Sequence, residues 1–170
     1  MKPELMNFRF FQYARFWVVA LLSICAMNFS GCGSGENEST ELVYDLRALM
    51  NAIKISDQET IRTELAAGAD PNGIFEDGYT ALMNAAAIGN PAVVRMLLEA
   101  GATPDLMPPD MNSAMHIAAQ AGHIEVLKVL LDAGADINLL SPHNATPAQF
   151  AEMAGKFAAR DYLKSRGGHL

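Results

Sequence analysis

A step of 33 residues repeats through most of this chain and constrains its fold more than any other feature. The pentapeptide Ala-Leu-Met-Asn-Ala occurs at 48–52 and again, unchanged, at 81–85. The same step relates three further sets: Gly68, Gly101, Gly134 and Gly167; Gly89, Gly122 and Gly155; Thr80, Ser113 and Thr146. A fixed period of this length is typical of a repeat architecture, in which copies of one supersecondary unit stack and bury a continuous core.

Signals for helix starts recur at the same step. Thr80, Ser113 and Thr146 stand where a hydroxyl can cap a helix N-terminus. Pro147 suits the first helical turn, where its missing N–H costs nothing. In the first copy, residues 56–59 (Ser-Asp-Gln-Glu) predict a capping box for the second helix.

Two short helices and a turn are expected in each copy. In the second copy they fall near 81–88 and 92–99, each with one apolar face. Gly101 and its equivalents are predicted to end the second helix in the left-handed conformation. Residues 72–79 then carry the turn chemistry of a hairpin that joins one copy to the next.

The best copy spans residues 113–138 and reads Ser-Ala-Met-His-Ile-Ala-Ala, then Gly-His-Ile-Glu-Val-Leu-Lys-Val-Leu-Leu, then Gly-Ala-Asp-Ile-Asn. It resembles the ankyrin repeat. The family's threonine-proline-leucine-histidine signature is spread over several copies, with its start at Thr146-Pro147 and its end at Met115-His116. The resemblance covers roughly residues 41–169 and implies an all-α solenoid of about four repeats joined by β-hairpin-like loops. The repeats are expected at roughly 41–73, 74–106, 107–139 and 140–170.

Both end copies lose one apolar edge of their second helix. The first copy turns polar at Thr60 and Glu64, and the last has Arg160 and Lys164 on the opposite edge. Terminal repeats of a solenoid carry a polar outer face because no neighbour covers it. The pattern therefore predicts four repeats and no more.

The first 31 residues have the pattern of an export signal. Lys2, Arg9 and Arg15 precede an apolar run at 16–27, which is shorter than the roughly 20 residues that a membrane-spanning helix needs. The following Phe-Ser-Gly-Cys at 29–32 resembles the lipobox of bacterial lipoproteins, with Phe in place of the usual Leu.

By that resemblance, residues 1–31 form a lipoprotein signal peptide and Cys32 carries the lipid. Residues 32–40 then form a small, polar tether, and residues 41–170 form the repeat domain. Gly33 follows the cysteine where the family's inner-membrane retention signal has Asp, which favours the outer membrane, with the domain facing the periplasm. Two alternatives remain: an uncleaved anchor, or ordinary cleavage nearby with Cys32 incidental.

Charge and cysteine usage exclude several classes of function. Beyond the export signal the chain has nine basic and eighteen acidic residues, a net charge of −9. This balance disfavours a nucleic-acid partner, because binding to phosphates needs a basic surface. Both cysteines, Cys25 and Cys32, lie near the N-terminus, so neither a disulfide framework nor a cysteine-based zinc site can support the repeat domain.

No arrangement of side chains in the sequence predicts catalysis or cofactor binding. His116 falls in the ankyrin signature and His123 in the turn between helices, which the resemblance makes structural positions. Asp70 and Asp136 recur with the hairpin and are interpreted as turn formers. Nothing brings together a nucleophile, a base and an orienting group, so we expect no enzyme, no metal and no cofactor.

The resemblance implies partner binding through the hairpin tips and the concave face of the first helices. Tyr79 is the first candidate, since aromatic side chains often dominate interfaces, and Met107 and Met111 add adaptable apolar surface. Met111 stands where the family has glycine, so a distorted tip is expected there. Alternatively, these side chains pack against neighbouring hairpins. The candidate set is Ile74, Glu76, Asp77, Tyr79, Ile88, Met107, Pro109, Asp110, Asn112, Gln120, His143 and Met153.

Three functions fit these features. The first is an envelope-anchored module that scaffolds or assists a periplasmic protein. The second is an immunity-type inhibitor of a toxin or hydrolase in the periplasm. The third is a structural lipoprotein that contacts cell wall or membrane components. In the first two the partner is a protein, and the acidic tips suggest that it offers a basic patch.

Overall fold

A computed structural model describes residues 46–170 of the chain, and in that range it contains eight α-helices and no β-strand. The helices are α2 (Leu46–Ile55), α3 (Gln58–Ala66), α4 (Ala81–Ile88), α5 (Pro91–Glu99), α6 (Ala114–Ala121), α7 (Ile124–Asp132), α8 (Pro147–Met153) and α9 (Phe157–Ser165). The predicted export signal, the predicted lipidation site Cys32 and the predicted tether lie outside the described residues.

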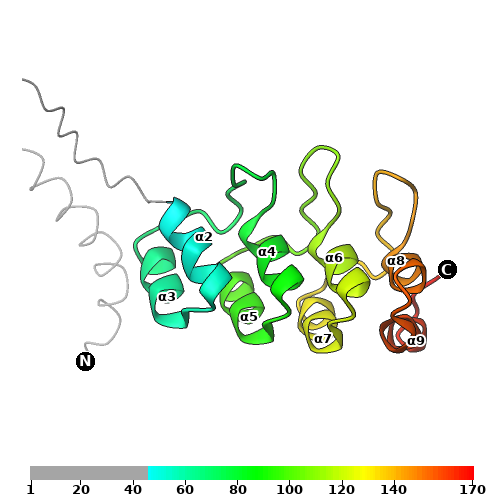
Figure 1. The fold of residues 1–170 in the computed structure, drawn as a ribbon. Helices are drawn as coiled ribbons and strands as arrows, with labels where there is room; N and C mark the ends of the chain where they lie inside the picture. The colour runs from blue at the N-terminus through cyan, green and yellow to red at the C-terminus, as the bar shows by residue number, and fades with distance from the viewer. Residues whose placement is uncertain (1–45) are drawn as a thin grey trace, which may run out of the picture. The chain divides into compact units, whose positions relative to one another are not determined.

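The helices form two layers of a stack, which Figure 1 shows from the side. Helices α2, α4, α6 and α8 lie in one layer, which we call the inner layer. Helices α3, α5, α7 and α9 lie in the other, the outer layer. The loops that precede α4, α6 and α8 all project from the same side of the stack. The all-α solenoid of helix pairs expected from the sequence is therefore confirmed.

The helix caps follow the sequence at two of the three predicted hydroxyl positions. Thr80 Oγ1 accepts the Met83 N–H at 3.2 Å, and Thr146 Oγ1 accepts the Gln149 N–H at 3.3 Å. Ser113 does not cap α6 with its side chain. Its hydroxyl instead donates to Nδ1 of the buried His116 at 2.8 Å, so the side chain is turned toward the imidazole ring.

The predicted capping box at residues 56–59 is wrong. The N-cap of α3 is Asp57, whose carboxylate accepts the N–H groups of Glu59 and Thr60 at 3.2 and 3.4 Å. Ser56 takes a left-handed backbone conformation, with φ of +57°, at the position that Gly89 occupies in the second copy with φ of +83°. The residue before the cap must turn the chain out of the first helix, so Ser56 serves as a glycine substitute and Asp57 as the cap.

The ends of the second helices are confirmed as left-handed turns. Gly101 has φ of +98°, and Gly68, Gly134 and Gly167 have φ of +102°, +86° and +98°. The Gly101 N–H bonds the Leu98 carbonyl at 3.0 Å and the Ala102 N–H bonds the Leu97 carbonyl at 2.9 Å, which satisfies two of the last carbonyls of α5.

The core is a continuous apolar layer between neighbouring copies, and it ends in charge at the last copy. Val94 and its equivalent Leu127 are fully buried, whereas Arg160 takes that position in α9. Arg160 pairs with Asp161 at 2.7 Å and with Glu152 at 3.4 Å, and Glu152 in turn replaces the buried Ala119 of the third copy. The last described repeat thus presents an ion pair where inner repeats bury methyl groups.

Candidate functional site

The second hairpin, residues 72–79, is closed by backbone hydrogen bonds around one buried side chain. Phe75 is 4% exposed and anchors the loop against the core. Its N–H donates to the Tyr79 carbonyl at 2.9 Å, and its carbonyl accepts the Gly78 N–H at 2.9 Å. Gly78 has φ of +80°, which lets the chain turn back toward α4.

The fourth hairpin is closed in the same way by Ser141, the equivalent of Phe75. The Ser141 N–H donates to the Ala145 carbonyl at 3.0 Å. The Ser141 hydroxyl also accepts the N–H groups of His143 at 3.3 Å and Ala145 at 3.1 Å, which braces the loop from inside. Asn144 takes the left-handed position with φ of +56°.

The third hairpin differs because Pro108 occupies the equivalent position. Proline has no N–H, so the bond that closes the other two hairpins cannot form here. The left-handed residue is Asp110, with φ of +61°, one position earlier than Gly78 and Asn144 in their copies. Pro109 followed by a residue of positive φ is the pattern of a type II turn. The distortion expected at Met111 is therefore present, and its cause lies in the proline as well as in the missing glycine.

Polar side chains tie the base of each hairpin region to the next copy. Asn72 donates to the Gly101 carbonyl at 3.1 Å and accepts the Thr103 N–H at 2.8 Å. Asn138 makes the equivalent pair of bonds, to the Gly167 carbonyl at 3.2 Å and from the His169 N–H at 2.8 Å. These side chains fix the spacing of the hairpins and so position the surface that they form.

Both histidines of the third copy hold neighbouring copies together, as the resemblance implies. His116 is fully buried, and its Nε2 donates to the Ala145 carbonyl of the fourth hairpin at 3.1 Å. His123 reaches the Ala87 carbonyl of the second copy at 3.2 Å. Burial lowers the pKa of His116, against the opposing effect of its backbone hydrogen bonds and of the Asp105 carboxylate. At neutral pH the lowered pKa favours the neutral ring, in which Nε2 donates to the Ala145 carbonyl and Nδ1 accepts from the Ser113 hydroxyl.

Most of the candidate contact residues point outward, but three are partly buried. Tyr79, Met107 and Asn112 are of intermediate exposure, and Tyr79 packs against the core. The alternative that these side chains pack against neighbouring hairpins stays a prediction, since the contact of Tyr79 is with the core. The exposed candidates are Ile74, Glu76, Asp77, Ile88, Pro109, Asp110, Gln120, His143 and Met153.

The sequence interpretation overlooked two exposed apolar side chains at equivalent positions. Leu140, which is 51% exposed, stands one step after Met107 and two after Ile74. Ile55, which is 75% exposed, stands one step before Ile88. The step of 33 was the signal that could have identified both, because residues at one position of the repeat occupy the same place on successive copies.

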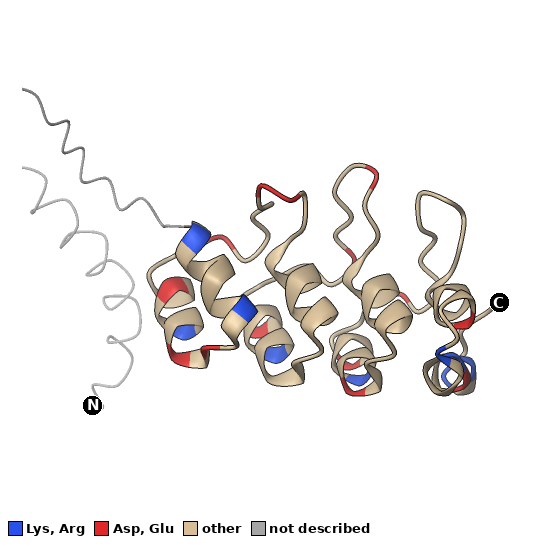
Figure 2. Cartoon of the chain, in the orientation of Figure 1, with Lys and Arg blue, Asp and Glu red and all other residues tan. Residues whose placement is uncertain are grey.

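Charged side chains are absent from α4 and α6 and present on the hairpins beside them. Helices α4 and α6 contain no Asp, Glu, Lys or Arg, and Figure 2 shows them without charge, whereas acidic groups lie on the second and third hairpins. Glu76 pairs with Arg47 of the first copy at 2.7 Å. One oxygen of Asp77 accepts the Tyr79 N–H at 3.0 Å. Helices α4 and α6 thus offer an uncharged face bordered by acidic hairpin tips.

Candidate metal clusters and bilayer-spanning helices are both absent from residues 46–170. No group of three His, Cys, Asp or Glu side chains in that range could hold a metal ion. None of the described helices combines the length and the apolar character needed to cross a bilayer.

Comparison with known families yields one match. A family model described as ankyrin repeats in three copies matches residues 20–108 and 49–141. No curated protein matches the chain.

Proposed function

The chain belongs to the ankyrin-repeat family, and from that premise we propose that it is an envelope-anchored module that scaffolds or assists a periplasmic protein. Ankyrin repeats generally mediate protein–protein interaction and are typically not enzymes. The binding surface is formed by the hairpin tips and by the outward face of α4, α6 and α8.

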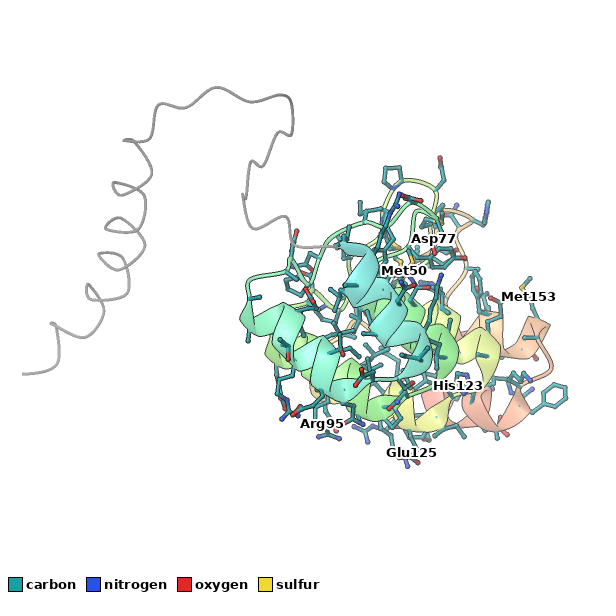
Figure 3. All side chains as sticks on the ribbon, turned by 60° about the vertical axis from the view of Figure 1, so that its left-hand side comes forward. Met50, Asp77, Arg95, His123, Glu125 and Met153 are labelled. Atoms are coloured by element: carbon teal, nitrogen blue, oxygen red, sulfur yellow. The ribbon has the colours of Figure 1, made fainter. Side chains whose placement is uncertain are left out.

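One observation carries the binding part of the proposal, namely apolar side chains left exposed on the hairpin and inner-helix side of the stack. Ile74, Ile88, Leu140 and Met153 are 50%, 41%, 51% and 81% exposed. Large apolar groups gathered on one face of a soluble domain favour association with another protein, because burying them releases them from water. Figure 3 shows Asp77 on the hairpin side, with Arg95 and Glu125 on the outer helices away from it.

The anchoring part rests on the N-terminal sequence. Cys32 carries the lipid, and the small, polar residues that follow tether the repeat domain to the outer membrane, where it faces the periplasm. The lipids added to this class of lipoprotein supply enough buried hydrocarbon for stable attachment, whereas one acyl chain alone gives marginal binding.

Fractionation of envelopes tests the anchor. The wild-type chain should incorporate labelled fatty acid and sediment with outer membranes, and Cys32→Ala should lose the label and the membrane association together. A Cys25→Ala variant is the control and should keep both. Labelling that persists in Cys32→Ala, or a wild-type chain without label, contradicts lipidation at Cys32.

Affinity capture from solubilised envelopes tests the surface. Ile88→Ser combined with Met153→Ser changes two exposed side chains of the inner layer, and Arg95→Ser is the matched control on the outer helix α5. A specific protein should be recovered by wild type and control and lost from the double variant, with unchanged thermal unfolding. Equal recovery by all three overturns the proposed surface.

The same capture separates the alternatives named above. Recovery of a toxin or hydrolase whose activity the chain suppresses replaces scaffolding by inhibition. Retention on purified peptidoglycan that the double variant does not weaken points to a structural role in the cell wall.

A further inference from the structure

We propose that the bound element of the partner is an apolar polypeptide segment with a basic residue at the end that lies toward the second and third hairpins. This inference rests on the proposed function, since it names the chemistry of the partner at the same surface.

The uncharged face of α4 and α6 determines the apolar part of the partner's segment. The outward side chains of α4 and α6 at matching positions are Ala87 and Gln120, with Ile88 beside the first and Ile117 partly exposed. None of them carries a charge, so a charged group of the partner placed here would lose water without gaining an ion pair. An apolar side chain gains by the same transfer.

A row of apolar side chains along the hairpins adds to this face. Ile74, Met107 and Leu140 occupy one repeat position in successive copies, and the first and last are about half exposed. Met107 between them is partly buried. Because equivalent positions recur along the stack, the partner meets apolar side chains on three consecutive hairpins rather than at one spot.

The acidic border dictates the basic end and where it lies. Asp77 and Asp110 occupy the same position of the second and third hairpins and are exposed, whereas the fourth hairpin has His143 there. Glu76 already pairs with Arg47, so the negative charge that faces an incoming partner comes mainly from the two aspartates. A Lys or Arg of the partner is drawn to them, and Arg gains more because its planar guanidinium can bond a carboxylate through two N–H groups.

This charge pattern also selects among classes of partner. Acidic tips repel phosphate groups, so anionic lipid headgroups and nucleic acids gain nothing at the hairpins. A segment that is apolar along its length but acidic at that end is repelled as well. The surface therefore discriminates by charge at its edge and binds by apolar contact at its centre.

Selection from random peptides displayed on phage tests this chemistry with the full chain, purified in mild detergent, as bait. Recovered peptides should combine apolar residues with Arg or Lys toward one end. A consensus without a basic residue, or one rich in Asp and Glu, overturns the inference. The place of binding is checked with the Ile88→Ser, Met153→Ser variant as bait in the same selection. That variant should recover none of these peptides.

Binding kinetics of one selected peptide then separate the two parts of the surface. Asp77→Asn with Asp110→Asn should lower the association rate about tenfold at low salt and abolish its salt dependence, because border charges act mainly on encounter. Ile74→Ser with Leu140→Ser should instead raise the dissociation rate. Asp132→Asn, an exposed carboxylate on the outer helix α7, is the matched control and should change neither. Unchanged association in the double Asn variant overturns the role of the acidic border.

The outcome is distinguishable from failure of the proposed function. If envelope capture recovers a partner through Ile88 and Met153 but the selected peptides lack a basic end, the function stands and the partner chemistry is wrong. If envelope capture also fails, the binding function itself is wrong.

Discussion

The joint between the third and fourth copies and the joint between the second and third are built from the same positions but held differently. At the joint of copies three and four, Asn138 both donates to and accepts from the last copy, and the buried His116 bonds the fourth hairpin. At the other joint, Asp105 stands in place of asparagine and only accepts, from the Asp136 N–H at 3.0 Å, and Met83 stands in place of His116.

The joint between the second and third copies, here the second joint, contains more apolar packing. Met83 is fully buried where the histidine would be, and Met111 of the third hairpin reaches over Gly78 of the second. The His123 ring lies against Gly89, so closely that a Cβ added there would stand 2.6 to 2.7 Å from three ring atoms. One repeat framework can therefore be joined with hydrogen bonds from a buried ring or with more apolar packing beside its hydrogen bonds, and the two joints are sensitive to different substitutions.

The largest effect is expected at the buried histidine. His116→Ala should reduce the free energy of unfolding by about 3 kcal/mol, because it leaves a cavity and strands the Ala145 carbonyl that Nε2 now bonds. Chemical denaturation measures this loss. His123→Ala, whose ring is only partly buried, is the control and should cost roughly 1 kcal/mol or less. Both rings bond a carbonyl of a neighbouring copy, so equal losses would mean that the deeper burial of His116 adds nothing.

A glycine comparison should expose the close packing of the second joint. Gly89→Ala should cost about 2–3 kcal/mol, since it combines positive φ with a clash against the His123 ring. Gly155→Ala is the same position in the last copy, with φ of +70° and nothing within 4 Å of the added Cβ. It carries only the backbone strain of about 1 kcal/mol. Melting temperatures of the pair decide the point, and equal shifts would mean that the ring moves aside freely.

Each of two single substitutions should make one joint resemble the other. Asn138→Asp removes the donor to the Gly167 carbonyl and should cost about 1 kcal/mol. Asp105→Asn should restore a donor at the second joint and add about 0.5–1 kcal/mol. Urea midpoints measure both changes. If Asp105→Asn destabilises the chain, the carboxylate has a role at that joint that the asparagines do not share.

The smallest effect is the pH dependence of the His116 joint. The folded-state pKa of His116 lies below its ordinary value of about 6.5, so the unfolded chain binds the proton more readily. The contribution of His116 is therefore fully present above pH 6.5 and is lost progressively as the pH falls below it. Thermal unfolding between neutral and mildly acidic pH should show this decline. His116→Met, which copies the second joint, should flatten that part of the curve, and an unchanged slope would assign the decline to other groups.

Much of the fold was predictable because its signals are local and repeated. The helix at 81–88 was expected with the bounds that it has, and the left-handed glycine after each second helix was expected from residue type alone. The prediction at 56–59 was wrong because a serine in the place of a glycine looked like a cap. Whether Ser56 caps or turns depends on where the preceding helix ends, which no local motif states.

The candidate surface was predictable by position but not by exposure. The family resemblance placed Ile74, Ile88 and Met153 on it, and the structure leaves all three exposed. Tyr79, the first candidate from the sequence, packs partly against the core instead, because a side chain at a hairpin base can turn inward as easily as outward. Leu140 was overlooked although its position in the repeat is that of Ile74.

The sequence by itself determined the repeat unit, the number of helix pairs and the positions of their turns, since periodic apolar residues, hydroxyl caps and glycines act within one copy. Only the tertiary structure decided how each copy is joined to the next. The roles of His116, Asn138 and Asp105 depend on atoms 29 to 31 residues away, at distances that arise only when the copies stack. The third hairpin, by contrast, differs for local reasons: Pro108 removes the donor of the closing bond, and Pro109 followed by Asp110 at φ of +61° makes the turn.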